Sequence, residues 1–183
     1  MESFLNDSSH LIQKMSDTID DFKNFFKPNK AKTKFLISSL VNESMVLMDD
    51  ALQNSAIVAN YSKKDDFILE TYKNELMQVM VNLLSNSIDA IKANGIEKGY
   101  IEITTKQEGN SCIISIQDNG GGMDSQIIDR VFEPYFTTKF QDEGTGLGLY
   151  MSKMIIDNSI RGMLSLKNHQ EGVLATITIE QIP

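Results

Sequence analysis

Hydrophobic and polar positions follow helical periods in some stretches of the chain and a period of two in others. Apolar residues recur every three or four positions across residues 5–26, which predicts an amphipathic helix that ends before Pro28. A polar linker at residues 29–34 follows, and hairpin spacing occurs twice further on. The pattern predicts strands at residues 34–38, 56–60, 67–70, 100–106, 112–117, 163–167 and 173–180, and helices at 40–53 (N-cap Ser39), 72–94, 124–131 (N-cap Asp124 or Ser125) and 147–158, with a loop at 132–144.

Strands and helices in comparable numbers, joined partly by hairpins, favour the α+β class. We therefore expect a two-layer α/β sandwich, in which helices cover one face of a mixed, mostly antiparallel sheet, preceded by the N-terminal helix. The 183 residues leave room for one such domain and a short appendage. The composition, 41% hydrophobic and 23% charged, is typical of a globular protein.

The formal net charge of −8 argues against general nucleic-acid binding, which needs a basic surface. It does not exclude a small anionic ligand, since backbone amides and a few lysines can hold phosphates. The single cysteine, Cys112, cannot form an internal disulfide, and no apolar run approaches the roughly 20 residues of a membrane span. The N-terminus lacks a signal-peptide pattern, so the sequence predicts a cytoplasmic domain without a membrane segment.

The long helix predicted at residues 72–94 is apolar except for one narrow polar stripe. A buried asparagine costs free energy unless its amide is hydrogen-bonded or coordinates a ligand. The stripe either faces solvent or faces a ligand, and asparagine oxygens would suit Mg²⁺ in the second case. At 100° per residue the members of the stripe are Glu75, Gln78, Asn82, Asn86 and Asp89.

Two glycine clusters stand at the edges of predicted elements. The first, at residues 120–122, directly follows a strand that ends near Asp118, whose carboxylate could accept a hydrogen bond from an exocyclic amine such as that of adenine. An ordinary Asp-Asn-Gly turn is the alternative. The second cluster, Gly144, Gly146 and Gly148, opens a helix and offers amides to an anion, although it lacks the Lys-Ser/Thr of a P-loop.

Between the clusters, residues 132–136 read Phe-Glu-Pro-Tyr-Phe, and Lys139 follows. This segment is either a buried aromatic plug or a lid with a cation for phosphate. The order of the stripe, the first glycine cluster, this segment and the second cluster resembles the ATP-binding domain of sensor histidine kinases, over residues 35–183. That family shares a superfamily with gyrase, MutL and the heat-shock chaperone ATPases.

The resemblance implies roles for the polar residues. Asn86 corresponds to the Mg²⁺ ligand, Asn82 to the companion asparagine that places the phosphates, and Asp118 to the carboxylate that reads adenine. The cofactors implied are ATP and Mg²⁺. Further ATP contacts implied are Asp89, Gly120, Gly122, Met123, Lys139, Gly144, Thr145, Gly146, Leu147 and Gly148.

The reaction depends on the residue one helical turn before the metal-binding asparagine. Gyrase-like members have a glutamate there that activates water, whereas Asn82 cannot accept a proton at neutral pH. We therefore expect autokinase activity, with phosphoryl transfer to a histidine rather than to water. Two alternatives stay open: a nucleotide-binding module without transfer, and a superfamily ATPase or serine kinase.

Neither histidine of the chain lies in an acceptor motif. His10 lacks the acidic neighbour of such a motif, and His169 lies in a predicted hairpin turn. Residues 1–28 resemble the second helix of a dimerisation hairpin, so we expect the acceptor histidine upstream on that module. The expected partners are this acceptor helix, a response regulator, and a second copy paired through residues 5–26. Relatives of this kind are often membrane-anchored.

Overall fold

The computed structural model describes residues 31–138 and 145–180. The helix predicted at residues 5–26, and the dimer contact expected from it, lie outside the described residues. The same holds for Lys139 and Gly144.

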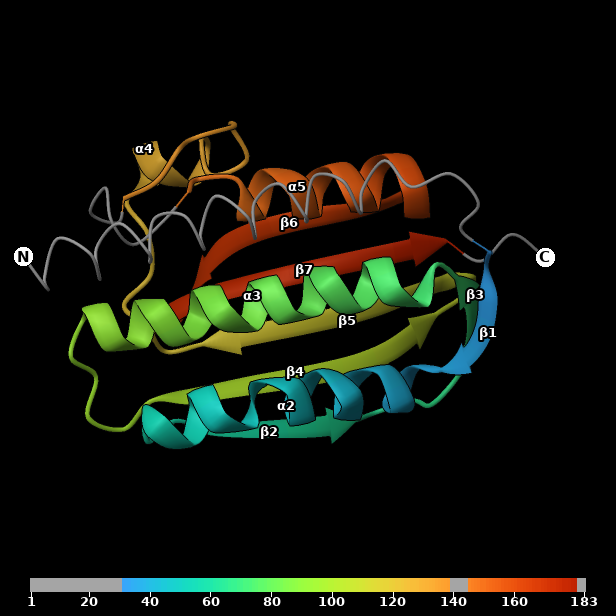
Figure 1. Cartoon of the computed structure of the whole chain (residues 1–183), viewed down its shortest axis with the longest axis horizontal. Coiled ribbons are helices and arrows are strands. Elements are labelled where there is room, and N and C mark those ends of the chain that lie inside the picture. Colours follow the sequence, from blue (N-terminus) through green and yellow to red (C-terminus); the bar gives the residue numbers. More distant parts are fainter. Residues whose placement is uncertain (1–30, 139–144, 181–183) are drawn as a thin grey trace, which may run out of the picture.

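Five strands form the main sheet, in the order β2-β4-β5-β7-β6. β2 and β4 run parallel, and the other neighbours pair antiparallel. Figure 1 shows the helices α2, α3 and α5 over one face of this sheet, which confirms the predicted α+β sandwich. The strands are β2 (Val58–Lys63), β4 (Tyr100–Glu108), β5 (Ser111–Asp118), β6 (Gly162–His169) and β7 (Gly172–Glu180).

The helices lie close to the predicted positions, with differences at their ends. Two further short strands, β1 (Thr33–Leu36) and β3 (Ile68–Thr71), pair antiparallel with each other in a separate small sheet. α5 is shorter than predicted because its last turns become a π-helix, η1 (Ile155–Ile160). The helices are α2 (Ile37–Asn54), α3 (Lys73–Ala93), α4 (Ser125–Ile128) and α5 (Gly148–Met154).

The core lies between the sheet and α3. Alternate side chains of β4 and β5, which share one face of the sheet, are almost fully buried. They meet the apolar sides of α3 in one continuous hydrophobic cluster. Members of the cluster include Ile101, Ile103, Ile114, Ile116, Leu76, Met80, Leu84 and Ile91.

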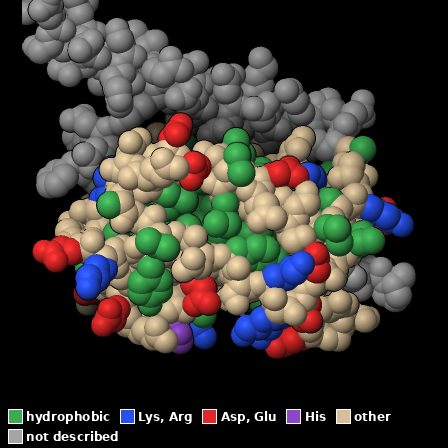
Figure 2. Space-filling view, turned by 90° about the horizontal axis from the view of Figure 1, so that it is seen from below, with side chains coloured by type: hydrophobic (Ala, Val, Ile, Leu, Met, Phe, Trp, Pro, Cys, Tyr) green, Lys and Arg blue, Asp and Glu red, His purple; other side chains and the backbone are tan. Residues whose placement is uncertain are grey.

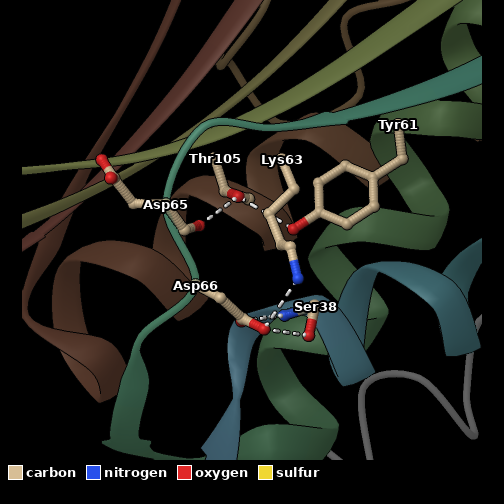
Figure 3. A network of polar contacts seen from close by, with 6 residues as sticks. All are labelled: Ser38, Tyr61, Lys63, Asp65, Asp66 and Thr105. Atoms are coloured by element: carbon tan, nitrogen blue, oxygen red, sulfur yellow. Dashed lines mark hydrogen bonds and ion pairs between the residues drawn. The ribbon is translucent and has the colours of Figure 1, made fainter.

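The start of α2 corrects one prediction. Ser39 is not the N-cap, because the helix begins at Ile37 and its Ser39 hydroxyl donates instead to Glu43. Asp66, 28 residues away, accepts from the backbone N–H and the hydroxyl of Ser38, at 3.3 and 2.9 Å. Lys63 also reaches Asp66, at 3.2 Å (Figure 3). A carboxylate from the loop before β3 therefore caps α2 across the fold.

Thr105 anchors the loop after β2 in the same network. Its hydroxyl lies 2.9 Å from the Tyr61 hydroxyl and donates to the Asp65 carbonyl, at 3.1 Å (Figure 3). The loop that carries Asp66 is thus fixed to β4. The prediction that Asp124 is the N-cap of the short helix α4 is confirmed, since its carboxylate accepts from the Gln126 N–H.

The outer face at α2 and β2 carries exposed apolar side chains, among them Val46, Leu47 and Val58. Figure 2, which views the molecule from that side, shows apolar side chains gathered among acidic and basic ones. In residues 31–138 and 145–180, no helix is both long enough and apolar enough to cross a membrane.

Candidate nucleotide site

The polar stripe of α3 does not face open solvent. Glu75 is buried, and the other four members are half-buried. All five side chains are therefore at least partly covered within the described residues, and a ligand facing the stripe stays a prediction. The stripe instead runs under the segment after β5 and beside α5, the regions that contain the two glycine clusters.

Near the middle of α3, a cavity of about 350 Å³ opens between this helix and α5. The structure brings together there four of the residues for which the resemblance implies an ATP contact, Asn82, Thr145, Leu147 and Gly148. The Asn82 side-chain N–H donates to the Ser152 hydroxyl, at 2.8 Å, and joins the two helices. The remaining lining residues are Gln78, Val81, Ser85, Met151, Ser152 and Ile155.

Close approach explains the glycines at this end. A Cβ placed on Gly148 would run into the Asn82 side chain. Gly146 has φ +65°, and a Cβ there would lie 2.5 Å from the carbonyl carbon of Tyr135. Tyr135 itself has φ +63° and is 76% exposed. The segment before α5 thus rests directly on the aromatic segment.

Asn86 lies one helical turn beyond Asn82 on the same stripe. Its side-chain nitrogen is buried and has no hydrogen-bond partner within the described residues. An amide that turns by 180° would present its oxygen at this place, so Asn86 fits an oxygen ligand for a cation. Mg²⁺ keeps several of its waters and needs few protein ligands. Asp89, on the same stripe, is half-buried.

Asp118 ends β5 and is only 4% exposed. Its Oδ1 accepts from the backbone N–H of Gly120 and of Val173, at 2.9 and 3.1 Å. Its Oδ2 accepts from the Ser87 hydroxyl, at 3.0 Å. Three donors from three parts of the chain thus fix the carboxylate. Since two carboxylate oxygens offer about four acceptor positions, Oδ2 can accept one more hydrogen bond.

The glycine segment after Asp118 lies against the second half of α3. A Cβ on Gly120 would lie 2.8 Å from the Ala90 Cβ, and the Asn94 side-chain N–H donates to the Gly120 carbonyl at 2.7 Å. Gly122, with φ +77°, leads into half-buried Met123. Ser87 is the neighbour of Asn86 in sequence, and its hydroxyl donates to Asp118. The predicted adenine-reading carboxylate and the predicted Mg²⁺ ligand are therefore connected through α3.

Some contributing residues were not predicted from the sequence. Ser87 holds Asp118, Ser152 holds Asn82, and Asn168 contacts the backbone of Met123. These pairs lie 31, 70 and 45 residues apart, and such contacts leave no local pattern. Only the position of Ser87 directly after Asn86 could have drawn attention to it.

The comparisons with known proteins agree on one family. A family model described as "Histidine kinase-, DNA gyrase B-, and HSP90-like ATPase" matches residues 71–183. Sporulation kinase B of Bacillus subtilis is 32% identical over 149 residues, which are 81% of this chain and 33% of that protein. The chain therefore spans about a third of the length of that relative.

Solved structures show the same fold. The nucleotide-free catalytic domain of histidine kinase ThkA superimposes with a TM-score of 0.73 at 29% identity, covering 81% of this chain and 95% of that chain. A second ThkA structure, in complex with response regulator protein TrrA, has a TM-score of 0.73 at 24% identity, covering 93% and 49%. The second likeness shows the fold alone.

Proposed function

The chain belongs to the family of histidine kinase-, DNA gyrase B- and HSP90-like ATPases, and on that premise we propose that it is the catalytic domain of a sensor histidine kinase. It binds Mg-ATP and transfers the γ-phosphoryl group to a histidine on a dimerisation helix. Of the named relatives, sporulation kinase B is a kinase by name, and the ThkA structure is that of the catalytic domain of a histidine kinase.

The hydrogen bonding of Asp118 is the observation that carries the proposal. Its buried carboxylate is fixed by three donors and keeps acceptor capacity on Oδ2. The adenine amino group is a donor, whereas guanine has an acceptor oxygen at the same position. A carboxylate held in this way therefore favours adenine over guanine.

The lining of the cavity favours transfer to a protein acceptor over hydrolysis. Within the described residues, the side chains that line it include asparagine, glutamine, serine and threonine but no carboxylate and no histidine. None of these groups can take a proton from water near neutral pH. Asn82 stands where a general base would be needed, and its amide nitrogen is engaged by Ser152. Water is therefore poorly activated.

Asn86 would hold Mg²⁺ through its side-chain oxygen. The ion supplies neutralisation of phosphate charge when bound. Asn82, the backbone of residues 145–148 and Lys139 would orient the triphosphate, with Gly144 at the start of this loop. The base would be surrounded by Asp118, Gly120, Gly122 and Met123. Asp89, on the polar stripe of α3, would be a further ATP contact. Positioning of the γ-phosphoryl group would then provide most of the catalysis.

The partners follow from the reaction. We propose that the acceptor histidine lies on an upstream dimerisation helix and that a response regulator receives the phosphoryl group from it, as in two-component pathways. The response regulator TrrA bound to ThkA supports this kind of partner. Pairing of two copies through residues 5–26, and placement in the cytoplasm where ATP is supplied, belong to the same proposal.

Transfer is tested with radiolabelled ATP, Mg²⁺ and a separate dimerisation domain that carries an acceptor histidine, supplied in trans. We expect an acid-labile, alkali-stable label on that domain and little free phosphate. Replacement of its acceptor histidine by glutamine is the control for the labelled site. Rapid release of phosphate by the native chain, unchanged in Asn82→Glu, would contradict the role of Asn82. Label without acid lability would point to a serine kinase.

A further inference from the structure

The side chain of Asn168, on β6, forms two hydrogen bonds with the backbone of Met123. Its Oδ1 accepts from the Met123 N–H at 2.8 Å, and its Nδ2 donates to the Met123 carbonyl at 2.7 Å. The amide thus imitates a neighbouring strand, because it satisfies the donor and the acceptor of one residue together. The two residues are 45 positions apart.

The turn between β6 and β7 binds the rest of the same segment. The Gly121 N–H donates to the Glu171 carbonyl at 2.7 Å, and the Val173 N–H donates to Asp118 Oδ1 at 3.1 Å. Asn168 and Val173 are paired residues of the hairpin. One rung of this hairpin therefore holds both ends of residues 118–123, at Met123 through Asn168 and at Asp118 through Val173.

Close packing makes this arrangement specific. A Cβ on Gly122 would lie 3.1 Å from the Asn168 side-chain oxygen, and a Cβ on Gly172 would run into the Asp118 backbone. Gly122 has φ +77°, a conformation in which the chain turns from Asp118 towards β6. Only Asn168 offers side-chain hydrogen bonds to Met123 in the part of the chain that the structure describes.

We propose that Asn168 is a positioning residue that determines base specificity, by fixing the backbone of Met123 relative to Asp118 on the adenine side of the site. The inference rests on the proposed function, because it places Met123 beside the base. Without these two hydrogen bonds, the one from the Gly121 N–H to Glu171 is the hydrogen bond that still ties residues 121–123 to the hairpin among the described residues. Met123 then no longer holds the base against the Asp118 carboxylate.

The test compares binding of Mg-ATP and Mg-GTP to the native chain and to Asn168→Ala, by calorimetry well below the melting temperature. We expect ATP affinity to fall roughly 3- to 10-fold, less than the full loss of two hydrogen bonds because they act on the base only through Met123, while GTP affinity changes little. The ratio of the two affinities therefore narrows. Asn168→Asp keeps the shape of the side chain but cannot donate to the Met123 carbonyl, so it should also lower the preference for ATP over GTP. Lys167→Ala, on the same strand, is the matched control.

A double variant separates positioning from general destabilisation. If Asn168 acts through Met123, Asn168→Ala should cost little further ATP affinity in a Met123→Ala background, since contacting residues are coupled. An unchanged ATP-to-GTP ratio in both Asn168 variants, with the preference lost in Asp118→Asn, would overturn this inference alone. A native chain that does not prefer ATP would overturn the proposed function and this inference with it.

Discussion

The two ends of the candidate nucleotide site are built in different ways. At the adenine end, the side chain of Asp118 and the backbone of residues 119–123 are held by α3, β6 and β7 through hydrogen bonds. At the phosphate end, the described residues surround a cavity of about 350 Å³, and the link between α3 and α5 is one hydrogen bond, from Asn82 to Ser152, among those described.

We propose that this difference separates base recognition, at the end around Asp118, from phosphate chemistry, at the cavity. Groups that are already fixed lose little freedom on binding, so a preorganised adenine end can discriminate bases at low entropic cost. Beyond the cavity lining, one turn along α3, the buried side-chain nitrogen of Asn86 has no hydrogen-bond partner within the described residues. We expect mutations at the adenine end to change which base binds, and mutations at the phosphate end to change how the triphosphate is held.

The largest effect is expected for Asp118→Asn. The asparagine oxygen can still accept from Gly120 and Val173, and the Ser87 hydroxyl can turn to accept from the new amide, so the fold should persist. That amide nitrogen, however, faces the adenine amino group as a second donor. ATP affinity should fall on the order of 10- to 100-fold by calorimetry, as for the loss of a charge-assisted hydrogen bond together with a donor clash.

Cys112 provides the control for that variant. It is fully buried on β5, and burial raises the pKa of its thiol to about 12. Alkylation of the folded chain at neutral pH should therefore be slow, because the thiolate is scarce and inaccessible. Unchanged ATP affinity together with slow alkylation would remove Asp118 from the adenine site.

The phosphate end is tested by Gly148→Ala. The added methyl group would press on the Asn82 side chain, and displacing that amide should disturb the phosphates. We expect a roughly tenfold loss of ATP affinity, about 1.4 kcal/mol and in the lower half of the range for overpacking, and a smaller loss for ADP. Gly109→Asn is the control, because nothing lies within 4 Å of a Cβ there and asparagine tolerates the left-handed φ of +58°. Equal losses for ATP and ADP would contradict the assignment of this end.

Ser87→Ala sharpens the comparison with a smaller change. It removes one of the three donors to Asp118 and leaves a cavity of one hydroxyl. We predict a 3- to 10-fold loss of ATP affinity, about 1 kcal/mol, with GTP affinity little changed. Ser115→Ala, half-buried on β5 and outside the lining of the cavity, is the matched control. A loss shared equally by both nucleotides would mean that Ser87 does not act on base recognition.

The smallest effect lies away from both ends, at the cap of α2. Hydrogen bonds from Ser38, followed by Lys63, hold the pKa of Asp66 below its ordinary value of 3.8. The ionised carboxylate therefore stabilises the fold above about pH 4, and this stabilisation is lost as the pH falls through the lower pKa of the folded state.

Thermal unfolding measures this contribution. Asp66→Ala should lower the melting temperature slightly at pH 7, and the difference from the native chain should vanish near pH 2. Asp50→Ala, which removes an exposed carboxylate on α2, the helix that Asp66 caps, is the control. A difference that persists at pH 2 would mean that side-chain packing, not the charge, explains the loss.

Much of the fold was predictable because it depends on local periodicity. Helix 72–94 and strand 112–117 lie within two residues of α3 and β5, whose apolar faces are dictated by their neighbours in sequence. The end of α5 was not predicted, since its conversion into a π-helix has no signature in the pattern. The N-cap at Ser39 was wrong because Asp66 supplies the cap from 28 residues away.

The candidate site shows the same division. Asp118 and the glycines beside it could be singled out, because an acid before a glycine turn is a local signal. Ser152 and Asn168 could not, because their contacts depend on which strands and helices become neighbours. Whether Asn82 and Asn86 act on phosphate and Mg²⁺ stays a prediction.

The most direct measurement is a calorimetric titration of the native chain with Mg-ATP, in which the baseline is followed after each injection. Saturable binding with a flat baseline is the predicted result, since we propose that the site recognises adenine nucleotides and does not activate water. Continuing heat after each injection would reveal hydrolysis and contradict the role assigned to Asn82. Absence of binding would contradict the nucleotide site itself.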